Sequence, residues 1–394
     1  MPEQRLHAAS KAFKPLRFNS CICIESIIPA KRKSLSSKHL IARHVNNKAF
    51  FAAGIIAVAA STTAQEAFSK ETTTNSPTSN RVASKPQTTR PTEFTFTAFG
   101  DAGWADTHVN SPRYSGGFKK AFQRFNKKQN TLGDINYINW ETSIGTQCNQ
   151  FWASHSPSTY AFLTHPRELE DAIKLGFNAI GLANNHSFDC VKSKEGNGPI
   201  QTYRFISKLK KNYPSTVFSG VFANEREEPA NKEITLKQGT VPVTLLSAYA
   251  GGNRSHCANI SCTLNLSKEK QAFADKKRLR ILALHSWNKS SHQSLKAILR
   301  QWIQDDLVDI AIGTGPHIAE TIEVVNTKHG KKILATSLGN FIHPSLAAQP
   351  NNAVLQTTWT IDPVSKEPKL LKANALKVSC DGTTCINTGT TKLH

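Results

Sequence analysis

A group of polar side chains follows a short apolar run near the middle of the sequence. The run Phe177–Ile180 leads into Gly181-Leu-Ala-Asn-Asn-His-Ser-Phe-Asp189, which brings two asparagines, a histidine and an aspartate within six residues. Amide oxygen and imidazole nitrogen are both metal ligands, and imidazole can also carry a proton near neutral pH. The pattern fits a metal-dependent site, and it equally fits an Asn-rich turn with a surface histidine. Other segments must decide between the two.

Polar residues of the same kinds follow other segments that are predicted to be strands. Apolar or alternating runs at 94–99, 135–138, 177–182, 278–284 and 308–312 predict strands, and helical patterns at 116–129, 166–175, 199–209 and 293–303 separate several of them. Strands alternating with helices indicate an α/β fold, in which ligands gather at the carboxyl ends of parallel strands. Further strands are predicted at 217–222, 241–248, 333–336, 353–361 and 370–378.

The residues at these strand ends are all types that bind metals. They are, in chain order, Asp101, Glu141, Asn185 with His186, His285 and His317. Carboxylates, an amide and imidazoles in one pocket suit a divalent cation such as Mn, Fe, Zn or Mg. The sequence therefore predicts a metal centre where the strands end.

Six short motifs carry a resemblance to a known family. They are Gly100-Asp101, Asn139-Trp-Glu141, Ala183-Asn-Asn-His186 with Asp189, the strand-end His285, Gly313-Thr-Gly-Pro-His317 and Ser337-Leu-Gly-Asn-Phe341. Together they resemble the CapA family of bacterial capsule and poly-γ-glutamate synthesis proteins, which is related to the calcineurin-like metallophosphatases. The resemblance covers residues 93–345. It implies a single large domain with a four-layer α/β/β/α sandwich, which strands in residues 346–394 complete.

The resemblance also implies roles for individual residues. Asp101, Glu141, Asn185, His285 and His317 match the metal ligands, for one or two ions, and His186 matches the proton donor. The supporting residues are Asn139, Asn184, Asp189 and Asn340. The implied function is metal-dependent, phosphoesterase-like hydrolysis in the biosynthesis of a capsule or envelope polymer of the poly-γ-glutamate type. The alternative is a non-catalytic assembly factor that keeps the fold and binds the polymer.

Three positions depart from the family pattern. Trp140 stands where members have leucine, Ser286 and Trp287 follow the strand-end histidine in place of a usual Trp-Gly, and Gly315 replaces a histidine. The loss at 315 implies either a one-metal site or a site without turnover. Asp106, His108 and His343 are candidate replacements, or else ordinary loop residues.

The N-terminal part of the chain has the pattern of an export signal. Ala49–Ala60 is a 12-residue apolar run with basic residues before it and small residues after it, which together predict a signal peptide within residues 1–64. A membrane anchor formed by residues 49–60 is the alternative, although a bilayer span takes about 20 residues. Residues 65–92 are rich in Ser, Thr and Pro and predict a flexible linker. We therefore expect an exported protein of the periplasm or cell envelope.

The formal net charge of +21 bears on possible partners. Residues 1–64 hold 10 Lys and Arg against 2 Asp and Glu, and the rest of the chain holds 39 against 26, so both parts are basic. A basic surface favours an anionic envelope or capsule polymer, unless it is simply a solvated lysine-rich surface. No stripe of basic residues with interleaved aromatics occurs, so nucleic acid is not expected. Membrane-associated capsule synthesis proteins are further partners that the resemblance implies.

Eight cysteines are present, two of them, Cys21 and Cys23, in the segment expected to be removed. An even number in the remaining part of an exported chain favours disulfides. Two pairs are local in sequence, and a third pair would join loops near the predicted site, although sequence alone does not fix the connectivity. The candidates are Cys148, Cys190, Cys257, Cys262, Cys380 and Cys385.

Overall fold

The computed structural model describes residues 93–105, 107–109, 117–127, 129–154, 159–221, 230–250, 266–343, 349–381 and 384–394. For residues 107–109 and 266–268 it describes the backbone alone. The predicted signal peptide, the linker, Asp106, Cys257 and Cys262 lie outside the described residues.

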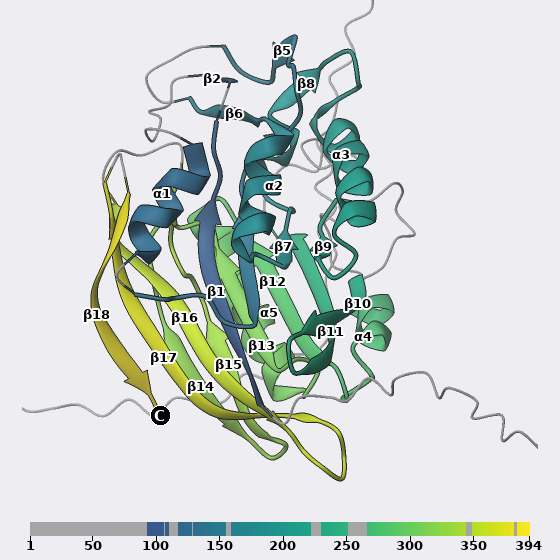
Figure 1. The fold of residues 1–394 in the computed structure, drawn as a ribbon, viewed down its shortest axis with the longest axis vertical. Helices are drawn as coiled ribbons and strands as arrows, with labels where there is room; N and C mark the ends of the chain where they lie inside the picture. The colour runs from purple at the N-terminus through teal and green to yellow at the C-terminus, as the bar shows by residue number, and fades with distance from the viewer. Residues whose placement is uncertain are drawn as a thin grey trace, which may run out of the picture. The chain divides into compact units, whose positions relative to one another are not determined.

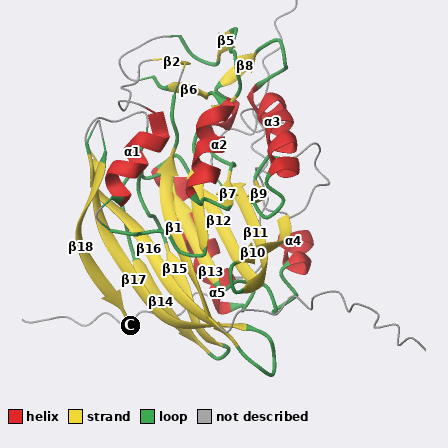
Figure 2. Cartoon of the chain, in the orientation of Figure 1, coloured by secondary structure: helices red, strands yellow, loops and turns green. Residues whose placement is uncertain are grey.

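Two large sheets form the centre of the described chain (Figures 1 and 2). Within the described residues, one sheet has seven strands in the order β18-β17-β16-β1-β3-β7-β9, and the other has six in the order β10-β11-β12-β13-β15-β14. The first comprises β1 (Glu93–Ala102), β3 (Ile135–Trp140), β7 (Ala179–Gly181), β9 (Val217–Ser219), β16 (Gln349–Ile361), β17 (Pro368–Cys380) and β18 (Cys385–Leu393). The second comprises β10 (Ala230–Leu236), β11 (Gly239–Tyr249), β12 (Leu279–His285), β13 (Ile310–Thr314), β14 (Ile322–Thr327) and β15 (Gly330–Ala335).

Both sheets have a parallel centre. Strands β1, β3, β7 and β9 run parallel to one another, as do β11, β12, β13 and β15. Antiparallel strands flank these centres: β16, β17 and β18 in the larger sheet, and β10 and β14 in the smaller. The carboxyl ends of the parallel strands consequently lie at one edge of each sheet, which is where the polar motifs occur.

Helices cover the outer face of each sheet. They are α1 (Gly117–Asn126), α2 (Pro166–Leu175), α3 (Gly198–Asn212), α4 (Leu266–Ala272) and α5 (Lys289–Gln304). Apolar residues of α1, α2 and α3 pack on the larger sheet, and those of α5 pack on the smaller one. A third apolar cluster contains residues of both sheets and fills the space between them. The layers are therefore α/β/β/α, which confirms the predicted fold class.

The first strand shows how the sequence pattern builds these layers. Phe94, Phe96 and Ala98 alternate along β1 and belong to the cluster between the sheets, whereas Phe99 belongs to the cluster under the helices. A strand turns successive side chains to opposite faces, so one alternating strand supplies both apolar layers. The pairing of β1 with β3 shifts register between Ala98 and Asp101, at the point where the strand reaches the polar motif.

Most predicted elements are present with small changes at their ends. The helix predicted at 166–175 has these bounds exactly: the side chain of His165 accepts a hydrogen bond from the Arg167 N–H at its start, and Gly176 ends it in the left-handed conformation. The strand predicted at 177–182 is shorter, Ala179–Gly181, and that predicted at 217–222 ends at Ser219. Several short or edge elements were not predicted from the sequence. They are β2 (Thr107–Val109), β4 (Ser143–Ile144), β5 (Gln150–Phe151), β6 (Ala161–Thr164), β8 (Cys190–Lys192), β10, β14, β18 and α4.

Two of the predicted disulfides are present. Cys148 is bonded to Cys190. Cys380, the last residue of β17, is bonded to Cys385, the first residue of β18. The first bridge joins the segment before β5 to β8, the strand that follows the polar stretch at 184–189. No helix in the described part of the chain is long and apolar enough to cross a membrane.

A buried ionic cluster lies at the end of the smaller sheet opposite the polar motifs. Arg280, near the start of β12, bonds Asp309 through its Nη2 at 2.9 Å and Asp306 through the same atom at 3.3 Å. Lys332 of β15 contacts the same two carboxylates at 2.6 and 3.0 Å. Burial alone would raise the pKa of Asp306, but Lys276, Lys332 and Arg280 outweigh it and lower that pKa well below 3.8.

This shift predicts a specific loss of stability in acid. A carboxyl whose pKa is lowered on folding stabilises the protein above its unfolded pKa, and that contribution disappears as the pH falls below that value. Between pH 4 and pH 2 we therefore expect wild type to lose more free energy of unfolding than Asp306→Asn. Urea unfolding across this range measures the difference, with Asp275→Asn as a control outside the cluster. Equal acid sensitivity of Asp306→Asn and wild type would contradict the assignment.

Candidate metal centre

The polar motifs meet because the ends of the parallel strands are in register. In the larger sheet, Asp101 pairs with Asn139, and Asn139 pairs with Gly181. In the smaller sheet, His285 pairs with Thr314. The side chain of Asn139 spans the two sheets, because its Nδ2 donates to Asp101 Oδ1 at 2.6 Å and lies 3.3 Å from His285 Nδ1. The site thus forms where the carboxyl ends of both sheets adjoin.

Close backbone packing joins β1 to the Ser337-Leu-Gly-Asn-Phe341 motif. The Asp101 N–H donates to the Gly339 carbonyl at 2.9 Å, and the Phe341 N–H donates to the Asp101 carbonyl at 2.6 Å. A Cβ atom at Gly100 would lie 1.9 Å from the Gly339 oxygen, so only glycine fits there. The two motifs are therefore parts of one contact, although about 240 residues separate them in sequence.

One group of potential ligands contains Asp101, Glu141 and His285, all buried. The Nδ1 atom of His285 lies 3.3 Å from Asp101 Oδ1, and its Nε2 atom lies 3.3 Å from Glu141 Oε1. The side-chain oxygen of Asn185, in the short 3₁₀ helix η1 (Asn185–Phe188), lies 2.6 Å from the same Nε2. Four of the five predicted ligands therefore lie together.

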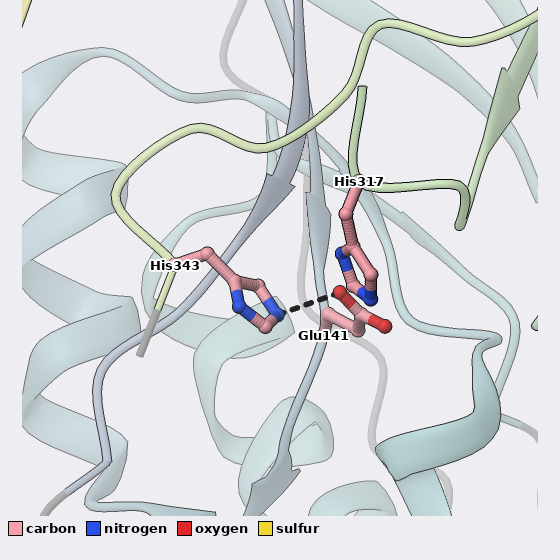
Figure 3. A group of neighbouring side chains, drawn as sticks. All are labelled: Glu141, His317 and His343. Carbon is pink, nitrogen blue, oxygen red and sulfur yellow. Dashed lines mark ion pairs between the residues drawn. The ribbon is translucent and has the colours of Figure 1, made fainter. Parts of the chain in front are cut away.

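A second group contains Glu141, His317 and His343 (Figure 3). The Nε2 atom of His343 lies 2.7 Å from Glu141 Oε2, and both imidazoles are directed toward this carboxylate. His317, the fifth predicted ligand, receives its orientation from Asn340, whose Oδ1 lies 2.8 Å from its Nδ1. Glu141 belongs to both groups.

The Glu141 carboxylate is the best evidence that these residues suit a cation. It is fully buried, yet neither oxygen has a hydrogen-bond partner of good geometry among the described residues. Buried carboxylates normally accept hydrogen bonds or bind metals. Imidazoles approach both of its oxygens, which is the donor set that Zn, Mn or Fe prefers. Asp101, Glu141, Asn185 and His285 thus fit a divalent metal ion.

The charges in the site agree with this reading. Burial opposes protonation of His285, but Asp101 and Glu141 outweigh it and raise its pKa to about 10. Burial also opposes ionisation of Glu141, yet the neighbouring His343 and His285 lower its pKa. The pKa of His343 is lowered, chiefly by burial. The positive charge of a protonated His285 balances part of the negative charge of the two carboxylates. A divalent cation can supply this positive charge instead, and His285 then releases its proton.

A histidine–aspartate pair lies beside the site. His186 directly follows Asn185, and its Nδ1 lies 2.6 Å from Asp189 Oδ2. Asp189 is held in turn by Trp152 Nε1 at 2.9 Å and by the backbone N–H of Phe162 at 2.7 Å. Burial would lower the pKa of His186, but the Asp189 carboxylate outweighs it, so that pKa is raised. The pair has the arrangement of an imidazole oriented to give or take a proton at Nε2.

The remaining predicted supporting residue, Asn184, shapes the backbone. Its Oδ1 accepts from the His186 N–H at 3.1 Å and its Nδ2 donates to the Trp140 carbonyl at 2.9 Å, so it caps η1 and ties it to β3. Trp140 itself is fully buried and packs on Phe118 with ring centroids 5.1 Å apart. The tryptophan at this position is therefore a packing residue.

The structure also explains the glycine at 315. Its φ is +114°, and a Cβ atom there would lie 1.6 Å from the Ser286 carbonyl oxygen. Its N–H donates to Asp101 Oδ2 at 2.8 Å. The loop is thus built around glycine at this position. Among the candidate replacements, His343 lies in the site, Asp106 lies outside the described residues, and only the backbone of His108 is described, in β2.

Comparison with known families agrees with this geometry. A family model described as bacterial capsule synthesis protein PGA_cap matches residues 95–345, which is more than half of the chain. The chain belongs to this family. A search of curated proteins found no match. The matched region contains every residue of both ligand groups and the histidine–aspartate pair, so the site described above lies wholly within the family domain.

Metal binding predicts a stability change that Asp101 controls. A ligand that binds only the folded chain stabilises it by about 2.7 kcal/mol at 100 times its Kd. We expect Mn²⁺ or Zn²⁺ to raise the thermal unfolding temperature of the chelator-treated protein. Asp101→Ala, which removes a carboxylate that contacts His285, should reduce the rise, and the exposed Asp275→Ala should keep it in full. An equal rise in both variants would mean that the metal binds elsewhere.

Proposed function

We propose that the chain is an exported metal-dependent hydrolase of the phosphoesterase type that acts on a capsule or envelope polymer. The observation that carries the proposal is Glu141: a buried carboxylate without good hydrogen-bond donors among the described residues, approached by imidazoles from separate loops. The histidine–aspartate pair beside it supplies the second requirement of such chemistry, a positioned proton donor. Membership of the capsule synthesis family favours an envelope substrate.

The residues of the site have three kinds of role in this proposal: metal binding, orientation of a ligand and proton donation. Asp101, Glu141, Asn185 and His285 would hold the metal. A divalent cation bound there would polarise a phosphoryl or carbonyl oxygen and activate water for attack. Asn139 fixes the Asp101 carboxylate by its 2.6 Å hydrogen bond, and so orients a ligand. His186, held at Nδ1 by Asp189, would donate a proton from Nε2 to the departing oxygen.

Export is part of the same proposal. The disulfides Cys148–Cys190 and Cys380–Cys385 are typical of proteins that fold in an oxidising compartment. The predicted signal peptide within residues 1–64 would direct the chain there, and the periplasm or cell envelope is where a capsule polymer is accessible. The anionic polymer and membrane-associated capsule synthesis proteins are the proposed partners.

The role of His186 can be tested by varying the leaving group. General acid catalysis contributes about 10²–10⁴-fold when the departing oxygen needs a proton. His186→Ala should therefore lower kcat by about this factor for a phosphodiester with an alkyl leaving group, and by much less for a p-nitrophenyl ester, whose leaving group is stable as an anion. Metal content should stay unchanged. His329→Ala, at an exposed histidine in the β14–β15 turn, is the control. Equal losses for both esters would rule out proton donation.

Polymer binding can be tested separately from turnover. The chain after residue 64 holds 39 Lys and Arg against 26 Asp and Glu, so binding of poly-γ-glutamate should weaken steeply as salt is added. Equilibrium binding at increasing NaCl measures this, with an uncharged polysaccharide as the control. Binding that ignores salt would contradict the proposed anionic partner. Salt-sensitive binding with bound metal but no hydrolysis of any ester would favour the non-catalytic assembly factor.

A further inference from the structure

Gly315 stands where the family pattern has a histidine, so the Gly313–His317 loop brings one imidazole fewer to Glu141. The φ of +114° and the 1.6 Å approach of a Cβ atom to Ser286 exclude a side chain at this position in the present loop. Gly315 contributes its N–H to Asp101 instead. The Gly313–His317 motif thus provides a single imidazole, His317, to the site.

A different segment brings a second imidazole to the same carboxylate. His343 is fully buried, and its Nε2 lies 2.7 Å from Glu141 Oε2 (Figure 3). The backbone before it is fixed by a hydrogen bond, because the Gly103 N–H donates to the Ile342 carbonyl at 3.2 Å. Gly103 lies two residues after the predicted ligand Asp101. His343 therefore reaches the site through the contact between β1 and residues 339–343.

The backbone is unusual at His317 itself and at Ile342, the residue before His343. Ile342 has a φ of +51° and His317 a φ of +60°. A β-branched residue seldom adopts this conformation, because its side chain then crowds the backbone. Such strain is expected where the surroundings hold a side chain in a functional position. Here both left-handed residues set the direction of an imidazole toward Glu141.

His317 also has the outer contact that metal-binding histidines have. Its Nδ1 is engaged by Asn340 Oδ1 at 2.8 Å, which leaves Nε2 as the nitrogen for a ligand. Metal-bound histidines almost always use their second nitrogen in this way, because the outer hydrogen bond fixes the ring and its tautomer. The backbone N–H of Asn340 is itself bonded to Asn352 Oδ1 at 2.7 Å, so the support extends to β16.

We propose that His343 is a ligand of a second divalent cation, which it binds together with His317 and Glu141. The centre then holds two cations, one on each side of the shared Glu141, and His343 supplies the imidazole that Gly315 cannot. The ligand atoms lie within 4.8 Å of one another, which small side-chain movements reconcile with metal–ligand bonds of about 2.0–2.2 Å. Two imidazoles and one carboxylate favour Zn, Mn or Fe over Mg or Ca. The inference rests on the proposed metal centre.

The competing explanation is a buried ion pair between His343 and Glu141 with no metal. It accounts for the 2.7 Å contact, but it leaves His317 directed at a carboxylate that accepts no well-formed hydrogen bond from it. A cation engages both imidazoles and the carboxylate oxygen at once. The two explanations differ in one measurable quantity, the number of metal ions bound.

The test is the metal content of the full chain. The protein is treated with a chelator, loaded with Zn²⁺ and freed of excess metal, and zinc is measured by elemental analysis. We expect two equivalents in wild type, one in His343→Ala, and two in His329→Ala, the matched control at an exposed histidine. Circular dichroism and thermal unfolding of each variant establish that it is folded.

A second variant guards against a folding defect from the lost imidazole. His343→Cys places a thiolate where the imidazole was, and cobalt bound to a thiolate gives a charge-transfer band in the near ultraviolet. We expect this band on addition of Co²⁺ to His343→Cys and not to His329→Cys. If His343 were only an ion-pair partner of Glu141, Co²⁺ would not bind at this position and His343→Cys would give no such band.

The outcomes separate this inference from the proposed function. Two equivalents of zinc in His343→Ala, or no cobalt band in His343→Cys, overturn the role of His343. One equivalent in wild type overturns the second cation site but leaves the proposed metal centre standing. No metal in wild type overturns both.

Discussion

Two carboxylates, Asp101 and Glu141, are fully buried where the carboxyl ends of two sheets adjoin, and the rest of the site follows from that constraint. An ionised carboxylate withdrawn from water costs several kcal/mol unless positive charge and hydrogen bonds compensate it. Asp101 is compensated by the Asn139 side chain and the Gly315 N–H. Glu141 has imidazoles around it but no comparable hydrogen bonds among the described residues. A site built in this way is incomplete as a purely structural arrangement and complete as a cation site.

The two ends of the smaller sheet solve the problem of buried charge in different ways. At the amino end of β12, two basic side chains balance two buried carboxylates. Each of the cations Arg280 and Lys332 contacts both Asp306 and Asp309. At its carboxyl end, His285 alone lies between Asp101 and Glu141. The first arrangement needs nothing further. The second has an excess of negative charge over permanent positive charge, which is the condition that attracts a metal.

The sequence was sufficient to predict the α/β fold class and the proximity of the residues in the first group, because both depend on local patterns. Strand periodicity located the strands, and parallel strands in a sheet end at a common edge, so Asp101, Glu141, Asn185 and His285 could be expected together. The edge strands β10, β14 and β18 were missed. Their alternation is weak or broken by polar residues, since an edge strand is covered less than a central one.

The position of His343 could not be predicted for a different physical reason. It follows the Ser337–Phe341 motif in a segment without periodicity, and its direction depends on the left-handed conformation of Ile342. That conformation depends in turn on backbone contacts between residues 339–342 and residues 101–103, which form only once the chain has folded. Its residue type was the only available signal, and a lone histidine in a loop carries little information.

Gly315 illustrates how a missing side chain can be misread in a sequence. Comparison with the family pattern suggests that a ligand has been lost, whereas the structure shows a glycine whose N–H bonds a predicted ligand and whose backbone packs on Ser286 more closely than any other residue would allow. The close packing holds the loop against β12, directly after His285. If an imidazole were restored at 315, this contact and the bond to Asp101 would both be disrupted. On the side of Glu141 that His317 faces, a second imidazole must therefore come from another segment, and among the described residues His343 provides it.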